Sequence, residues 1–69
     1  MRERISKKHL ASAMLNADIT TIRDLAAVSG VSINTLSRSQ NGGMVKLSTA
    51  GRIAKALGVD VADIIEGGI

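Results

Sequence analysis

A short polar segment of this chain carries side chains that can pair with nucleic-acid bases. If residues 33–40 form a helix with Leu36 at the centre of its buried side, steps of 100° place Asn34, Arg38 and Asn41 on the opposite face. Arginine pairs with guanine, and asparagine with adenine, through two hydrogen bonds each. Asn34 and Arg38 are therefore candidate readers of base edges in a major groove. The alternative for each is an ordinary solvent-exposed position on a helix.

The residues around this segment have the spacing of a helix-turn-helix, counted as twenty positions from Ile22 to Asn41. Ala26, at the fifth position, is small enough to let two helices cross closely, and Gly30, at the ninth, allows a tight turn. The shared core is expected to come from the fourth, tenth and fifteenth positions, which are Leu25, Val31 and Leu36. Ser39 stands at the eighteenth position, where a branched apolar residue is usual, so we expect a weaker core beneath it.

Apolar spacing and capping residues predict that the whole chain is helical. Apolar residues recur at i, i+3, i+4 and i+7, which indicates helices over about residues 6–17 and 47–57. Thr21 with Asp24 forms a capping box for a second helix, Ser32 caps a third, and Asp60 caps a short fifth. The prediction is an all-α fold of five helices, with residues 22–41 forming the motif within one domain over residues 1–69.

The composition excludes several classes of protein. The 69 residues contain no cysteine and no aromatic side chain, and the net charge is +3. A positive charge favours a polyanion, but single-stranded RNA recognition usually needs aromatic platforms, so double-stranded DNA is the expected partner. His9 has no second metal-ligating neighbour, and no catalytic motif is present. We therefore expect no enzyme activity, cofactor, metal or small-molecule ligand.

The expected location is the cytoplasm, because without cysteine nothing points to an oxidising compartment. No apolar run is long enough to span a membrane and no signal-peptide region follows the polar start, so we expect a soluble, uncleaved protein. The basic residues near the start leave two alternatives open. They are either an arm that touches the DNA backbone or minor groove, or a solvated, disordered end. These residues are Arg2, Arg4, Lys7 and Lys8.

The stretch TIRDLAAVSGVSINTLSRSQNG, followed by LSTAGRIAKALGVDVADII, resembles the Cro and phage-repressor family of DNA-binding domains over Thr20 to Ile65. This resemblance implies the five-helix, lambda repressor-like fold, with its second and third helices forming the helix-turn-helix. It also implies that the start of the third helix reads bases. The base-contacting set is then Ile33, Asn34, Ser37 and Arg38.

The same resemblance implies contacts to the DNA backbone from Thr21, Ile22, Ser32, Thr35, Asn41 and Lys46. Ile22 replaces the family's usual glutamine, so only backbone amides remain to hold a phosphate there. Ile33 departs from the usual polar residue, and it either reads a thymine methyl group or joins the core. Lys46 is expected in a loop near the DNA, whereas Arg52 and Lys55 are expected on the far side of the fourth helix.

Apolar residues in a loop and near the end of the chain predict a partner subunit, because a small monomer exposes few of them. Met44, Val45 and Ile69 are of this kind, and the expected dimer interface is Val59, Val61, Ile64 and Ile65. The function expected is that of a Cro-like transcriptional repressor that binds a pseudo-palindromic operator as a homodimer. The alternative is a protein-interaction module of the same fold, such as an antitoxin or an anti-repressor partner.

Overall fold

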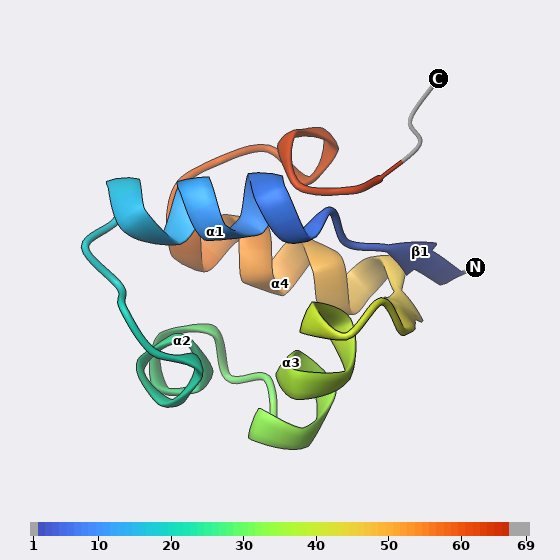
Figure 1. Ribbon diagram of the computed structural model, residues 1–69, viewed down its shortest axis with the longest axis horizontal. Helices are drawn as coiled ribbons and strands as arrows, with labels where there is room; N and C mark the ends of the chain where they lie inside the picture. Colours follow the sequence, from blue (N-terminus) through green and yellow to red (C-terminus); the bar gives the residue numbers. More distant parts are fainter. Residues whose placement is uncertain (1, 67–69) are drawn as a thin grey trace.

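A computed structural model describes residues 2–66 and shows a bundle of four α-helices with a small sheet at one end (Figure 1). The helices are α1 (Lys7–Asn16), α2 (Ile22–Ser29), α3 (Ile33–Gln40) and α4 (Leu47–Leu57). In Figure 1, α1 lies at the top, α2 and α3 lie at the bottom, and α4 lies between them in contact with α2. The predicted helix-turn-helix of α2 and α3 is therefore confirmed.

Side-chain caps explain where the helices begin. The Oγ1 of Thr21 accepts a hydrogen bond from the amide of Asp24 at 3.1 Å, and the Oγ of Ser32 accepts one from the amide of Thr35 at 3.2 Å. Each bond satisfies an amide that has no partner inside the helix. Helix α2 ends at Gly30, whose φ of 73° lies in the left-handed region that glycine adopts without strain. The turn between the two helices is thus set by local sequence.

The prediction of an all-α chain is wrong, because strand β1 (Arg2–Arg4) pairs with strand β2 (Met44–Lys46) in an antiparallel two-stranded sheet. Val45, expected to be exposed in a loop, is instead buried at 3% exposure. The alternation that buries Val45 between two exposed neighbours covers only three residues, too few to give a clear periodic signal. Arg2 and Arg4 therefore lie in an ordered strand and Lys7 and Lys8 lie in α1, so these basic residues do not form a free arm.

The predicted fifth helix is also wrong, because a 3₁₀ turn at Val61–Asp63 takes its place. After this turn the chain runs antiparallel to the start of the molecule, with Ile65 bridged to Ile5. The amide of Ser6 donates to the carbonyl of Ile64 at 2.7 Å, and that of Glu66 donates to the carbonyl of Arg4 at 2.6 Å. This pairing satisfies backbone groups that a longer helix would have used internally.

The core is aliphatic and lies between α4 and the other elements. Its fully buried members are Ile5, Leu10, Leu25, Leu36, Ala50, Ile53 and Ile64. Ile64 is 0% exposed, so its side chain packs inside this molecule and offers no surface to a second copy, contrary to its expected place in a dimer interface. Val59, Val61 and Ile65 pack against the same core but stay half-buried.

Ser39, the departure from the motif, is 1% exposed and faces this core. Its Oγ donates to the carbonyl of Thr35 at 3.1 Å, so the buried hydroxyl has a partner. A serine in this position fills less of the core than a branched side chain, but it leaves no orphaned polar group.

Candidate nucleic-acid interface

Helix α3 presents an exposed polar face on the side opposite its buried residue Leu36. Asn34, Arg38 and the C-cap residue Asn41 are exposed, and Ser37 is half-buried beside them. Ile33 is 47% exposed at the first position of the helix, so it does not join the core and its side chain is free to contact a partner. The predicted base-contacting residues therefore share one accessible surface at the helix.

Beside this surface lies a hollow of about 300 Å³ between the start of α3 and the start of α4, here called the α3–α4 hollow. Its polar lining consists of Ser32, Thr35, Lys46, Ser48, Thr49 and Arg52. The structure thus brings together three of the predicted backbone-contacting residues, Ser32, Thr35 and Lys46. The lining combines two cations with four hydroxyl groups, of which that of Ser32 already donates to Thr35. Cations and free hydroxyl groups are donors suited to a phosphate.

A second hollow of about 230 Å³ lies between the sheet and α3, here called the sheet–α3 hollow. It shares Thr35, Lys46 and Thr49 with the first hollow, and its other charged residues are Arg2 and Arg38. Within residues 2–66, no carboxylate lines either hollow. The two hollows therefore form one continuous surface of positive charge and hydroxyl groups along α3.

Gly43 fixes the position of Arg38 in this surface. The amide of Gly43 donates to the carbonyl of Arg38 at 2.8 Å, and this bond closes the turn after α3. A Cβ atom on Gly43 would lie 2.9 Å from that carbonyl oxygen and would also overlap the Cγ of Arg38. The arginine stem thus packs directly on the glycine, which leaves room for no other side chain there.

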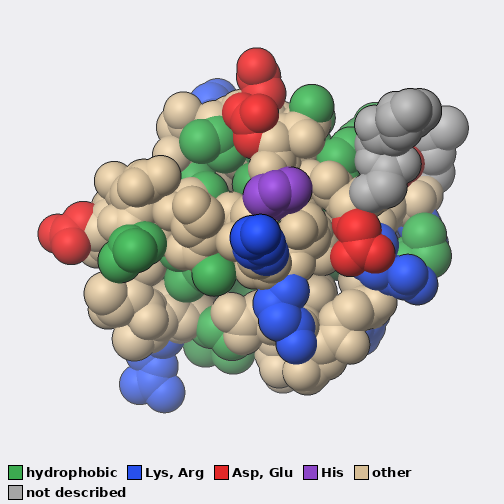
Figure 2. Space-filling model, turned by 45° about the horizontal axis from the view of Figure 1, so that its top comes forward, with side chains coloured by type: hydrophobic (Ala, Val, Ile, Leu, Met, Phe, Trp, Pro, Cys, Tyr) green, Lys and Arg blue, Asp and Glu red, His purple; other side chains and the backbone are tan. Residues whose placement is uncertain are grey.

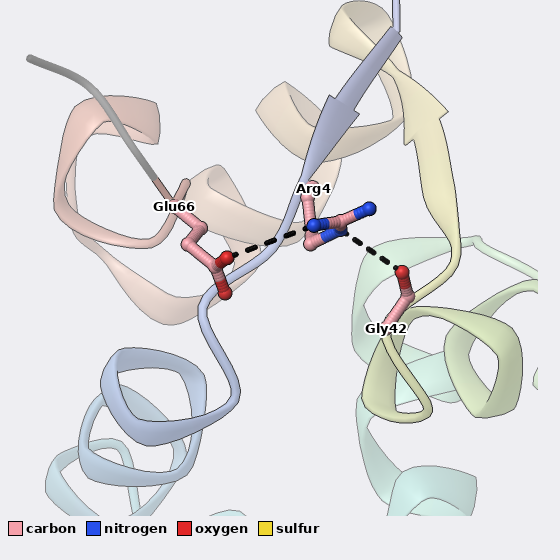
Figure 3. Close-up of polar contacts among 3 residues, drawn as sticks. All are labelled: Arg4, Gly42 and Glu66. Carbon is pink, nitrogen blue, oxygen red and sulfur yellow. Dashed lines mark hydrogen bonds and ion pairs between the residues drawn. The ribbon is translucent and has the colours of Figure 1, made fainter.

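The side chain of Arg4 links the sheet to the turn that follows α3 (Figure 3). Its Nε donates to the carbonyl of Gly42 at 3.1 Å, and its Nη1 lies 3.9 Å from the Oε1 of Glu66. Both charged side chains are about half exposed, so this ion pair is a weak one. Of the four basic residues near the start of the chain, Arg4 therefore has a structural role within the molecule.

The start of α2 does not reach either hollow. Ile22 is half-buried and packs against the core, and the Thr21 hydroxyl accepts from the Asp24 amide. Because this hydroxyl accepts, its own hydrogen stays available, so this helix end can offer a phosphate the Thr21 hydroxyl as well as its first backbone amides. Asn41 ends α3 as its C-cap residue and lines neither hollow.

Two candidate residues were missed or misplaced by the sequence reasoning. Arg52 was expected on the far side of the fourth helix, but it lines the α3–α4 hollow together with Ser48 and Thr49. Arg52 follows Ser48 by four residues and Thr49 by three, so the three side chains lie on one face of α4. Helical periodicity could therefore have predicted the place of Arg52. Arg2 could not be found in this way, because its place depends on the unpredicted sheet.

The opposite side of the molecule has a different character. Figure 2 turns the α1 side toward the reader and shows acidic and basic side chains spread among small, separate hydrophobic areas. Among the residues that the structure describes, no group of three or more acidic or histidine side chains could hold a metal ion, and no helix is long and apolar enough to cross a membrane. The two hollows beside α3 are instead lined by the cations Arg2, Arg38, Lys46 and Arg52.

The paired helices α2 and α3, with an exposed polar face on the second, define a helix-turn-helix domain. The chain belongs to the family of Cro/C1-type helix-turn-helix DNA-binding domains, because the model of that family matches residues 5–66. The family resemblance predicted from the sequence is thus confirmed. No curated protein and no solved structure shows a significant match to the chain.

Proposed function

We propose that this protein is a sequence-specific regulator of transcription that inserts α3 into the major groove of double-stranded DNA. One observation carries the proposal: the exposed polar face of α3 adjoins two hollows lined by cations and hydroxyl groups, and none of the described carboxylates lines them. A groove-binding helix needs this combination, because base edges confer specificity while phosphate contacts fix its position.

In this proposal the residues of α3 read bases. Asn34 pairs with adenine and Arg38 with guanine, and Ile33 contacts a thymine methyl group. Ser37, half-buried beside them, supplies a hydroxyl group that can pair with any base. The short side chains around Asn34 and Arg38 leave the helix narrow enough to enter the groove.

The backbone contacts come from the residues around the two hollows and from helix ends. Lys46 and Arg52 supply charge, and Thr35 supplies a hydroxyl donor, which Ser32 orients by donating its own hydroxyl hydrogen to the Oγ1 of Thr35. Asn41 contacts a phosphate from the end of α3. At the start of α2 the main-chain amides next to Thr21 and Ile22 replace the missing side-chain contact.

A dimer would place two copies of α3 about 34 Å apart, which matches successive major grooves on one side of the duplex. The half-buried residues Val59, Val61 and Ile65 keep some surface for a second copy, whereas Ile64 is used inside the subunit. We place the dimer contact at this segment. The resulting complex would occupy a pseudo-palindromic operator and act as a Cro-like repressor by blocking polymerase.

Selection of bound sequences from a random duplex pool tests this function. The expected result is an enriched pseudo-palindrome with half-sites about one helical turn apart. Repeating the selection with Asn34→Ala should erase the preference at one position in each half-site and leave the other positions unchanged. A pool that is not enriched by the unmodified protein overturns sequence-specific binding, and enrichment of single half-sites alone overturns the dimer.

A further inference from the structure

The small sheet sets two cations directly opposite each other. Arg2 of β1 pairs in register with Lys46 of β2. In an antiparallel sheet, side chains directly opposite each other lie on the same face with Cβ atoms about 4.5–5.5 Å apart, and like charges in this arrangement destabilise the pair. Arg38 of α3 lines the same hollow, so three cations surround it.

None of the described carboxylates lies within ion-pair distance of Arg2, Lys46 or Arg38. Arg4 lies two residues further along β1. Within residues 2–66, the one ion pair is that between Arg4 and Glu66. Glu3 lies between the two arginines, so strand alternation directs it to the opposite face of the sheet. Arg2 and Lys46 are therefore left facing each other across a hollow without a counter-ion.

The hollow also carries hydroxyl groups that are free to donate. The Oγ1 of Thr35 accepts a hydrogen bond from the Oγ of Ser32 at 2.9 Å, so its own hydrogen remains available. Thr49 contributes a second hydroxyl to the lining. Cations and hydroxyl donors around a shallow hollow are the groups that bind a phosphodiester oxygen.

We propose that a backbone phosphate of double-stranded DNA occupies the sheet–α3 hollow, held between Arg2 and Lys46. Strand β1 is then a DNA-binding element, because its pairing with β2 carries Arg2 to the side of the recognition helix. Arg38 takes part in both kinds of contact, since it lines the hollow and also lies on the exposed polar face of α3 that is proposed to read bases. This assignment rests on the proposed DNA-binding function and adds a contact from a part of the chain outside the helix-turn-helix.

The proposal has a consequence for stability. Repulsion between Arg2 and Lys46 lowers the stability of the free protein, and a bound phosphate removes that repulsion. A substitution that relieves the repulsion should therefore stabilise the free protein and weaken its complex with DNA. A merely structural role for Arg2 predicts the opposite effect on stability.

A salt titration of three proteins tests the contact. The full chain, Arg2→Gln and Lys8→Gln are each titrated with a random-sequence duplex of about 20 base pairs, a length of roughly two helical turns. Lys8 is exposed on α1 and lines neither hollow, so its substitution gives the same net charge without touching the site. Loss of one phosphate contact lowers the slope of log affinity against log salt by about 1 unit.

We expect that lower slope for Arg2→Gln and a slope close to that of the unmodified protein for Lys8→Gln. The affinity deficit of Arg2→Gln should shrink about threefold between 50 and 200 mM salt, as one released counter-ion requires. If the unmodified protein binds log-linearly and the two variants have equal slopes, the contact at Arg2 is overturned and the proposed function stands. If the unmodified protein does not bind duplex DNA at low salt, the proposed function itself fails.

Thermal unfolding of Arg2→Glu gives a second readout that does not depend on DNA. This substitution turns a like-charge cross-strand pair into an opposite-charge pair, so the melting temperature should rise while affinity for the duplex falls. A lower melting temperature would mean that Arg2 stabilises the sheet, and it would contradict the proposal.

Discussion

The Nε of Arg4 donates a hydrogen bond of 3.1 Å to the carbonyl oxygen of Gly42, and this bond joins strand β1 to the turn that ends α3. The Nη1 of the same guanidinium group lies 3.9 Å from the Oε1 of Glu66, a residue that follows the Val61–Asp63 turn. One side chain near the start of the protein thus connects the turn after α3 with the C-terminal segment. The sheet is therefore part of the support for the proposed DNA-binding surface.

Arg4→Gln should lower the free energy of unfolding by about 1 kcal/mol, because an exposed hydrogen bond to a carbonyl and a weak ion pair are both lost. Glu66→Gln removes only the ion pair, which is half exposed on both sides, and should cost less than about 0.5 kcal/mol. Urea denaturation of the two variants measures the difference. Equal losses would show that the bond to Gly42 contributes nothing.

Arg38 and Lys46 should differ in their effect on specificity. Arg38→Ala should cost about 1–3 kcal/mol on a selected operator and relax the preference at one base pair. Lys46→Ala should weaken binding to operator and random duplexes alike, because a phosphate contact carries no sequence information. Titrations of both variants on both duplexes make the comparison. Equal losses on the two duplexes for Arg38→Ala would reject its role as a base reader.

Two glycines should respond to alanine in opposite directions. Gly43→Ala places a Cβ atom 2.9 Å from the backbone carbonyl of Arg38, which cannot move without opening the turn, so we expect a loss of about 1–3 kcal/mol. Gly51 lies within α4 with open space around it, and Gly51→Ala should gain about 1 kcal/mol from helix propensity.

Chemical denaturation of both variants measures these changes, and Gly51→Ala serves as the control for the added methyl group. Gly43→Ala should also weaken DNA binding, because the displaced turn carries Arg38 with it. A neutral Gly43→Ala variant with unchanged affinity would show that the packing of Arg38 on this glycine has no role.

Arg52 should contribute to DNA affinity although it lies outside the helix-turn-helix. Arg52→Gln should lower affinity for random duplex and reduce the salt slope by about 1 unit, as expected for one lost phosphate contact. Lys55→Gln is the matched control, because Lys55 is an exposed cation of the same helix that lines neither hollow. If the two variants bind alike, Arg52 has no specific role at the interface.

The elements that local sequence specifies were predicted with good accuracy. The caps at Thr21 and Ser32 and the left-handed turn at Gly30 act over three or four residues, so their chemistry is visible in the sequence. The core positions Leu25, Val31 and Leu36 followed from the same spacing, and all three are buried. The polar face of α3 followed in turn from the position of Leu36.

The features that were missed depend on contacts between distant residues. Strands β1 and β2 are three residues each and lie some forty residues apart, so neither has a signal of its own. The burial of Ile64 comes from the return of the chain beside Ile5, which competes with helix formation after Asp60. The hollow at Arg2 exists only because the sheet forms. The sequence could therefore suggest Arg2 as part of a DNA-contacting arm, but not as a residue fixed beside α3.

Mapping of amide NMR shifts on addition of duplex DNA tests the interface most directly. The account predicts that shifts cluster in α3, in Arg2 and Lys46 of the sheet, and at the start of α4, and that the outer side of α1 stays unchanged. Shifts confined to α1 and the Val61–Asp63 turn, or the absence of any shift at low salt, would contradict it.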